Sequence, residues 1–244
     1  MRFTQDGFLG GRVVARQPAE GFRSGTDAVM LAAAVPAKAG DELLELGCGV
    51  GVAALCVAAR VADCRLTGIE IAPGLVERAN ENVRANPFGD SVHVEHANVF
   101  RLPSHLRRSF DHVFCNPPFH APAGEVSPNA DRARALSDSD GLGNWIAAGF
   151  ARVASSGTLT VILRADRLAE ALQGLPQQGV SIFPLWPRSG EAAKRVILHI
   201  QKDSRAPVRL LGGLVLHERD GGYTPEAEAV LRDGASLALA NSRL

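Results

Sequence analysis

Residues 42–51 read Glu42-Leu43-Leu44-Glu45-Leu46-Gly47-Cys48-Gly49-Val50-Gly51, and the architecture follows from them. The first five residues predict a buried strand, and the three alternate glycines predict a tight loop. The apolar residues 52–62 that come next predict a helix. Because glycine has no Cβ, a ligand can lie directly against the backbone of such a loop. This segment therefore predicts a ligand-binding turn between a strand and a helix.

The alternation of strands and helices continues downstream. Residues 65–70, 92–95 and 111–115 predict three more strands, and Pro73 begins a predicted helix that runs to about residue 86. Further strands are predicted at 158–163, 180–186, 196–200 and 208–216, and further helices at 145–154, 165–175 and 226–232. This order predicts an α/β fold of the Rossmann-like kind, with a mostly parallel, twisted sheet and helices on both faces.

We expect one domain over residues 1–244, because a chain of 244 residues can bury a single sizeable core. Residues 36–244 form the predicted Rossmann-like core. Residues 1–35 form a predicted N-terminal extension, in which a hairpin within 3–22 precedes a helix from Thr26 to Val35. Thr26 is the predicted N-cap of that helix, and Pro36 stops it.

The composition is that of a soluble protein, with 46% hydrophobic and 21% charged residues. We expect a cytoplasmic protein, because no leader or membrane-spanning stretch is visible and the four cysteines form no C-x-x-C pair. The histidines and cysteines form no metal-ligand cluster, so no metal is expected. The 26 basic and 26 acidic residues balance, which argues against strong non-specific binding of nucleic acid.

Two carboxylates accompany the glycine loop. Glu70 ends the second predicted strand 19 residues after Gly51, where a carboxylate can accept hydrogen bonds from both hydroxyls of a ribose. Glu45 precedes the loop and can attract a cationic ligand. The run 49–54 also fits the dinucleotide fingerprint G-x-G-x-x-A, so a nicotinamide dehydrogenase is one alternative, and a glycine turn without any ligand is another.

The fourth predicted strand ends in Asn116-Pro117-Pro118-Phe119. The Asn116 side-chain oxygen and the Pro117 carbonyl can both accept hydrogen bonds from one NH2 group, and the prolines have no N–H that would compete. Phe119 offers a flat face on which a heterocycle can stack. The motif predicts a site that holds a planar amine as a methyl acceptor, although prolines after a strand also form plain turns.

Basic residues near this motif are candidates for contacts with an RNA backbone. The stretch 187–209 carries four more basic than acidic residues, and the long segment 120–143 carries an Asp-Arg-Ala-Arg run. The candidates are Arg132, Arg134, Arg188, Lys194 and Arg195. Each of them is also compatible with an ordinary solvated surface.

These motifs together resemble the class I S-adenosylmethionine-dependent methyltransferases. The resemblance rests on Glu-x-Gly-x-Gly-x-Gly at 45–51, on Gly68-Ile69-Glu70-Ile71 and on Asn-Pro-Pro-Phe. The flanking runs 21–29, 187–190 and 216–224 are similar to the bacterial tRNA adenine-N6 methyltransferases that modify the base beside the anticodon of a valine tRNA. The resemblance implies S-adenosyl-L-methionine as cofactor and RNA, namely a tRNA, as partner.

It also implies the residues of the site. Cofactor contacts are expected at Thr26, Asp27, Glu45, Gly47, Cys48, Gly49, Gly51, Glu70, Ile71, Asn98, Val99 and Asn116, and the catalytic motif is Asn116, Pro117, Pro118 and Phe119. Asn98 stands where an Asp commonly contacts the adenine of the cofactor, and Phe119 replaces a frequent Tyr. Asn-Pro-Pro-Phe also occurs in guanine-N2 methyltransferases of ribosomal RNA. That activity, methylation of a protein glutamine, and a scaffold without turnover therefore stay open as alternatives, as does the oligomeric state.

Overall fold

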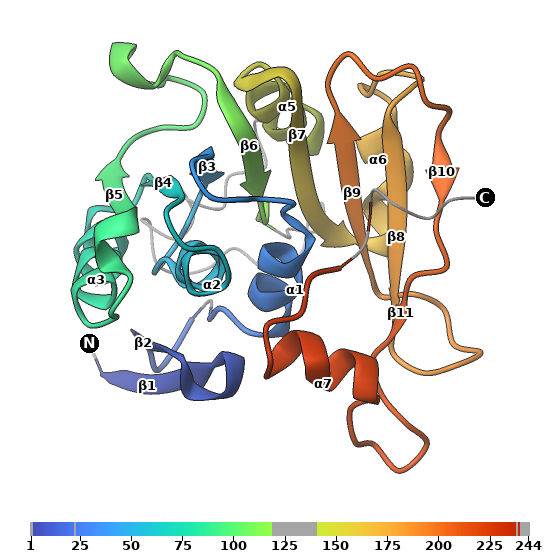
Figure 1. Cartoon of the computed structure of the whole chain (residues 1–244), viewed down its shortest axis with the longest axis horizontal. Helices are drawn as coiled ribbons and strands as arrows, with labels where there is room; N and C mark the ends of the chain where they lie inside the picture. Colours follow the sequence, from blue (N-terminus) through green and yellow to red (C-terminus); the bar gives the residue numbers. More distant parts are fainter. Residues whose placement is uncertain (1, 22, 119–140, 238, 240–244) are drawn as a thin grey trace.

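The structure is a computed structural model that describes residues 2–21, 23–118, 141–237 and 239. The predicted site residues Phe119, Arg132 and Arg134 lie outside the described residues. In Figure 1 a central sheet carries helices on both sides, and a separate hairpin lies next to α2 and α3.

The central sheet confirms the predicted fold class. Its strand order is β10-β8-β9-β7-β6-β3-β4-β5, with β11 pairing with β8. Only β9 runs antiparallel to its neighbours β7 and β8. The strands are β3 (Glu42–Leu46), β4 (Arg65–Glu70), β5 (Val92–His96), β6 (Phe110–Cys115), β7 (Val153–Arg164), β8 (Val180–Trp186), β9 (Arg195–Gln201), β10 (Arg209–Leu210) and β11 (Leu214–Val215).

Alternate residues of the central strands belong to two separate hydrophobic clusters. Phe114 of β6 joins a cluster with the buried residues of α1 and α2, whereas Val113 and Cys115 join a cluster with residues of α5. The helices are α1 (Thr26–Ala34), α2 (Val52–Arg60), α3 (Pro73–Arg84), α5 (Gly141–Phe150), α6 (Leu168–Leu172) and α7 (Pro225–Leu231). Both faces of the sheet are therefore covered, as the hydrophobic runs of its strands require.

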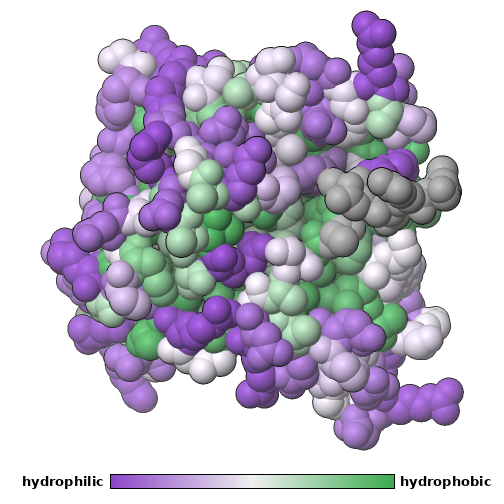
Figure 2. Space-filling model, viewed as in Figure 1, coloured by the Kyte–Doolittle hydropathy of each residue, from purple (hydrophilic) through white to green (hydrophobic). Residues whose placement is uncertain are grey.

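The N-terminal hairpin consists of β1 (Phe3–Phe8) and β2 (Val13–Pro18), which pair antiparallel in a sheet of their own. Short 3-10 turns occur at Leu9–Gly11, Gly89–Ser91, Ser104–Leu106 and Ala165–Arg167. Within the described part of the chain, no helix is long and apolar enough to cross a membrane. The face in Figure 2 has hydrophilic side chains around its rim and hydrophobic ones toward its middle.

Two predicted details were wrong. Thr26 is the first residue of α1, not its N-cap, because Gly25 occupies the capping position. The strand predicted at 208–216 is interrupted, because Gly213 adopts a φ of +78° and a Cβ there would lie 2.2 Å from the Pro184 carbonyl oxygen. The chain therefore pairs with β8 twice, through β10 and then through β11.

The connection pattern places a topological switch point at β3. From β3 the chain moves outward through β4 and β5, then returns to form β6 and β7 on the other side of β3. Ligands of open α/β sheets bind at the carboxyl ends of the strands that flank such a point. The residues that follow β3, β4 and β6 therefore lie where a ligand of this fold would bind.

Candidate active site

The segments that the sequence singled out come together at this switch point. Leu46 of β3 pairs with Cys115 of β6 on one side and with Ile69 of β4 on the other. The glycine loop that follows Leu46 therefore lies between Asn116 and Glu70, which follow Cys115 and Ile69 in the chain. Parallel pairing alone produces this juxtaposition of three segments that are distant in sequence.

The glycine loop has a left-handed backbone conformation that residues other than glycine rarely adopt. Gly47, Gly49 and Gly51 have φ values of +68°, +56° and +84°. A Cβ on Gly49 would meet no atom within 4 Å, so the backbone there faces open space. This loop fits a ligand that approaches the main chain closely.

Glu70 contacts the glycine loop with one carboxylate oxygen and the N-cap residue of α3 with the other. Its Oε2 accepts a hydrogen bond of 3.0 Å from the Gly49 N–H, and its Oε1 accepts one of 2.9 Å from the Ala72 N–H. The side chain is only 7% exposed. A carboxylate offers about four lone-pair sites, so each oxygen can still accept from a further donor such as a ribose hydroxyl.

Glu45 lies beneath the first turn of α2. It is 4% exposed, and its Oε2 accepts a hydrogen bond of 3.0 Å from the Ala54 N–H. Burial raises the pKa of this carboxyl to about 8, the Ala54 hydrogen bond lowers it in part, and the nearby Glu70 charge raises it further. A cation bound beside this carboxyl would favour its ionised form.

The remaining predicted cofactor residues surround the same edge. Cys48 is buried, and its Sγ lies in the space that Gly68 leaves by having no side chain. Burial raises the pKa of the Cys48 thiol well above its ordinary value, so it is not a nucleophile. Ile71 is 40% exposed just after β4, whereas Val99 is buried after β5.

Asn98, expected beside the adenine of the cofactor, has its side-chain oxygen engaged within the chain. Its Oδ1 accepts a hydrogen bond of 2.8 Å from the Phe100 N–H. This contact engages the acceptor end of the carboxamide, so the geometry favours the amide NH2 as the group that donates to a ligand.

Asn116 presents the most telling feature of the site. Its Oδ1 is buried, yet it has no hydrogen-bond partner among the residues that the structure describes. An unpaired buried acceptor is costly, and native proteins retain such groups where a ligand satisfies them. Of the two prolines that follow, Pro117 is buried and Pro118 half-buried.

Arg167 contacts the same motif and was not predicted. Its Nη1 lies 3.5 Å from the Pro118 carbonyl oxygen, and its guanidinium pairs with both oxygens of Glu170 at 2.9 and 2.8 Å. Glu170 in turn accepts from the Leu142 N–H at 3.2 Å. The pair thereby fixes Pro118 and the start of α5, and no sequence signal beyond a charged pair three residues apart pointed to it.

Trp145 is a second residue that sequence reasoning missed. A Cβ on Gly47 would lie 2.9 Å from its ring, and the ring also packs edge-on against Phe100 with centroids 5.7 Å apart. Phe100 is 37% exposed. The two aromatics form a wall between the glycine loop and the segment after β5, and only the position of Trp145 in a predicted helix hinted at burial.

The predicted residues at the start of α1 connect to the far part of the sheet. The Asp27 carboxylate accepts a hydrogen bond of 2.8 Å from Arg195 Nε, and Thr26 precedes it in the first turn. Arg195 was expected at the RNA backbone, but here it joins α1 to β9. Arg188 and Lys194 are exposed in the connection between β8 and β9, and Arg188 pairs with Glu191 at 3.4 Å.

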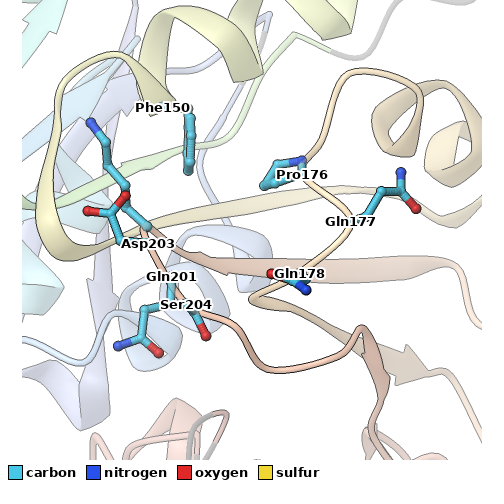
Figure 3. A pocket seen from close by; sticks show the side chains of 8 residues that line it. Phe150, Pro176, Gln177, Gln178, Gln201, Asp203 and Ser204 are labelled. Atoms are coloured by element: carbon cyan, nitrogen blue, oxygen red, sulfur yellow. The ribbon is translucent and has the colours of Figure 1, made fainter.

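A surface pocket of about 440 Å³ lies elsewhere. Figure 3 shows its lining, which includes Phe150, Pro176 and Gln178. It adjoins the amino ends of β7 and β8, at the opposite edge from Asn116.

The described ranges contain no group of three His, Cys, Asp or Glu side chains that could hold a metal ion.

Comparison with known proteins finds methyltransferases. Residues 21–134 match the methyltransferase small domain family. Two relatives called tRNA1(Val) (adenine(37)-N6)-methyltransferase, from Yersinia pseudotuberculosis and Yersinia pestis, are 25% and 27% identical. The matches cover 87% of this chain and 85% and 86% of those proteins.

Solved structures show the same fold. A predicted O-methyltransferase of Agrobacterium tumefaciens superposes with a TM-score of 0.72 at 26% identity, covering 86% of this chain and 98% of that one. A precorrin-6y C5,15-methyltransferase of Geobacter metallireducens gives 0.51 at 16% identity over 73% of this chain and 87% of that one, a likeness of fold alone. The fold is accordingly that of the S-adenosylmethionine-dependent methyltransferases, as the motifs predicted, and the matched family is a methyltransferase family.

Proposed function

We propose that this methyltransferase transfers a methyl group from S-adenosylmethionine to an exocyclic amine of an RNA base, namely N6 of an adenine in a tRNA. The single observation that carries the proposal is the unpaired, buried Oδ1 of Asn116 at the switch point. An amine N–H of the acceptor would satisfy that oxygen. A methyl acceptor without any hydrogen-bond donor, such as a carboxylate oxygen, would leave it unpaired.

The residues at the edge fit the cofactor. Glu70 would accept from its ribose hydroxyls, the open face at Gly49 would admit it against the backbone, and Glu45 would balance positive charge. When bound, the cofactor supplies an electrophilic methyl group on a sulfonium. The protein therefore needs to position a lone pair rather than to activate a nucleophile.

Asn116 and the Pro117 carbonyl would perform that positioning. Both are acceptors, so they hold the NH2 group in place and stabilise the positive charge that the nitrogen gains. Arg167 holds the Pro118 carbonyl and so fixes the direction in which the motif leaves β6. Phe119 is proposed to stack on the base, which must leave its own stack to enter.

The choice of base follows the relatives. Their names specify adenine and a tRNA, and the matched part covers nearly all of both chains. Guanine N2 is the second candidate, because it too is an exocyclic amine that the same pair of acceptors would hold.

Transfer of a labelled methyl group to separate RNA and protein fractions tests the substrate class. Purified protein is incubated with S-adenosylmethionine that carries a labelled methyl group, together with tRNA, ribosomal RNA or ribosomal protein. We expect label in tRNA. Label confined to protein would instead assign glutamine methylation, and label in ribosomal RNA alone would reject the tRNA.

Glu45 makes cofactor binding depend on pH. With a pKa of about 8 it is mostly protonated in the free protein at neutral pH, and a bound cation favours its ionised form. Affinity should therefore rise between about pH 6 and about pH 7.5, by up to roughly tenfold per pH unit, while the cofactor's α-amino group is still charged. Glu45→Gln should abolish this slope. Calorimetry at the two pH values checks it, and equal affinities in the parent would contradict the role of Glu45.

Arg188 and Lys194 should contribute to RNA binding through phosphates. Exchanging both for Gln should lower RNA affinity and reduce the slope of log affinity against log salt by about 0.7–0.9 for each lost contact. Arg205→Gln is the matched control, because Arg205 is exposed after the carboxyl end of β9 at the opposite edge. Filter binding at several salt concentrations measures the slopes. Identical slopes in the double variant and the parent would remove these residues from the interface.

A further inference from the structure

The outer edge of β2 is paired with side chains instead of a strand. Two asparagines one turn apart on α3, Asn82 and Asn86, act as its partners. The Arg16 N–H donates to Asn82 Oδ1 at 2.8 Å, and Asn82 Nδ2 donates back to the Arg16 carbonyl at 3.2 Å. Asn86 makes the same two contacts with Val14, at 3.0 and 2.9 Å. Each carboxamide thus takes the place of a peptide group in a neighbouring strand.

Asn82 differs from Asn86 in one further contact. Its Nδ2 also donates a hydrogen bond of 3.0 Å to the Val50 carbonyl, between Gly49 and Gly51. Asn86 Nδ2 instead donates to the Asn82 carbonyl within α3. Asn82 is 1% exposed, so its contacts exclude water. A single buried carboxamide therefore joins the hairpin, α3 and the glycine loop.

The hairpin also holds the segment that precedes α1. The carboxamide of Gln17, which is 1% exposed, accepts from the Ser24 N–H at 2.8 Å and donates to the Ser24 carbonyl at 3.0 Å. Arg23 pairs with both oxygens of Asp6 at 2.8 and 2.6 Å. The hairpin is thereby fastened to the two backbone segments that flank the proposed cofactor site.

We propose that Asn82 is a positioning residue for cofactor binding, and that it acts by fixing the Val50 carbonyl of the glycine loop against the N-terminal hairpin. The loop needs a contact that holds its conformation, because a backbone with three glycines can adopt many other conformations. The inference rests on the cofactor lying at this loop, and it is independent of the RNA that is methylated.

Asn82→Ala and Asn86→Ala form a matched pair for the test. Both remove a carboxamide from the β2 edge, so both should lower the melting temperature. Only Asn82→Ala releases the glycine loop. We expect the Kd for S-adenosylmethionine, measured by calorimetry without RNA, to rise about three- to tenfold in Asn82→Ala, which is the worth of one hydrogen bond. It should change less than twofold in Asn86→Ala, and in turnover the loss should appear in KM rather than kcat.

A second measurement uses the unmodified chain. Because coupling is reciprocal, saturating cofactor must slow amide hydrogen exchange in residues 13–18 of the hairpin if Asn82 couples the two segments. Equal Kd values in the two variants, or unchanged exchange at 13–18, would overturn the role of Asn82. Neither the calorimetry nor the exchange measurement contains RNA, so failure to methylate tRNA would count against the proposed substrate alone.

Discussion

Asn116→Ala should cut the single-turnover methylation rate by on the order of a hundredfold or more, comparable to the loss of one preorganised electrostatic contact. The reason is that the buried Oδ1 has no hydrogen-bond partner among the described residues and would gain one from the acceptor. Its interaction strengthens as the amine becomes positive, so the loss should fall on the rate and far less on cofactor affinity.

Rapid-quench kinetics with saturating cofactor and RNA measure this effect. Gln177→Ala is a suitable control, because it removes an exposed side chain at the opposite edge of the sheet and should leave the rate unchanged. Asn116→Asp keeps an acceptor oxygen and should retain more activity than the alanine variant. Full activity in Asn116→Ala would refute the role of the amine clamp.

Glu70→Ala should weaken S-adenosylmethionine binding by about ten- to a hundredfold, the range that corresponds to hydrogen bonds to a charged group. Two losses combine here. The ribose loses its proposed acceptor, and the Gly49 and Ala72 N–H groups lose the carboxylate that now holds them.

Calorimetry gives the affinity, and circular dichroism gives the melting temperature of the same samples. Glu42→Ala provides the control, since Glu42 is a half-buried carboxylate at the other end of β3 that pairs with Arg65. An affinity in Glu70→Ala equal to that of the parent would exclude Glu70 from the cofactor site.

Much of the fold was predictable because short-range signals and tertiary structure agree. Glycine and proline mark the ends of Glu42–Leu46 and the start of α3, and buried parallel strands read as apolar runs. The split of 208–216 into β10 and β11 could not be predicted, because it depends on Gly213 passing close to the Pro184 carbonyl of another strand.

The site residues, too, could be predicted only in part. Glu70 and Asn116 were found because each follows a predicted strand, and parallel pairing brings such positions together. Trp145 and Arg167 were missed, because their contacts with Gly47 and Pro118 arise from the packing of α5 and of the turn after β7 against the sheet. The contacts of Asn82 could not be predicted for a similar reason, because the sequence does not indicate which backbone groups an asparagine within a helix will contact.

The central claim, transfer of a methyl group to N6 of adenine in tRNA, is tested most directly by identifying the product. Unmodified tRNA transcripts are incubated with the protein and S-adenosylmethionine bearing a deuterated methyl group, then digested to nucleosides and analysed by mass spectrometry. We predict that the deuterated methyl group is recovered as N6-methyladenosine, and that Asn116→Ala lowers its yield at early times. Recovery as N2-methylguanosine, or the absence of any labelled nucleoside, would contradict the proposal.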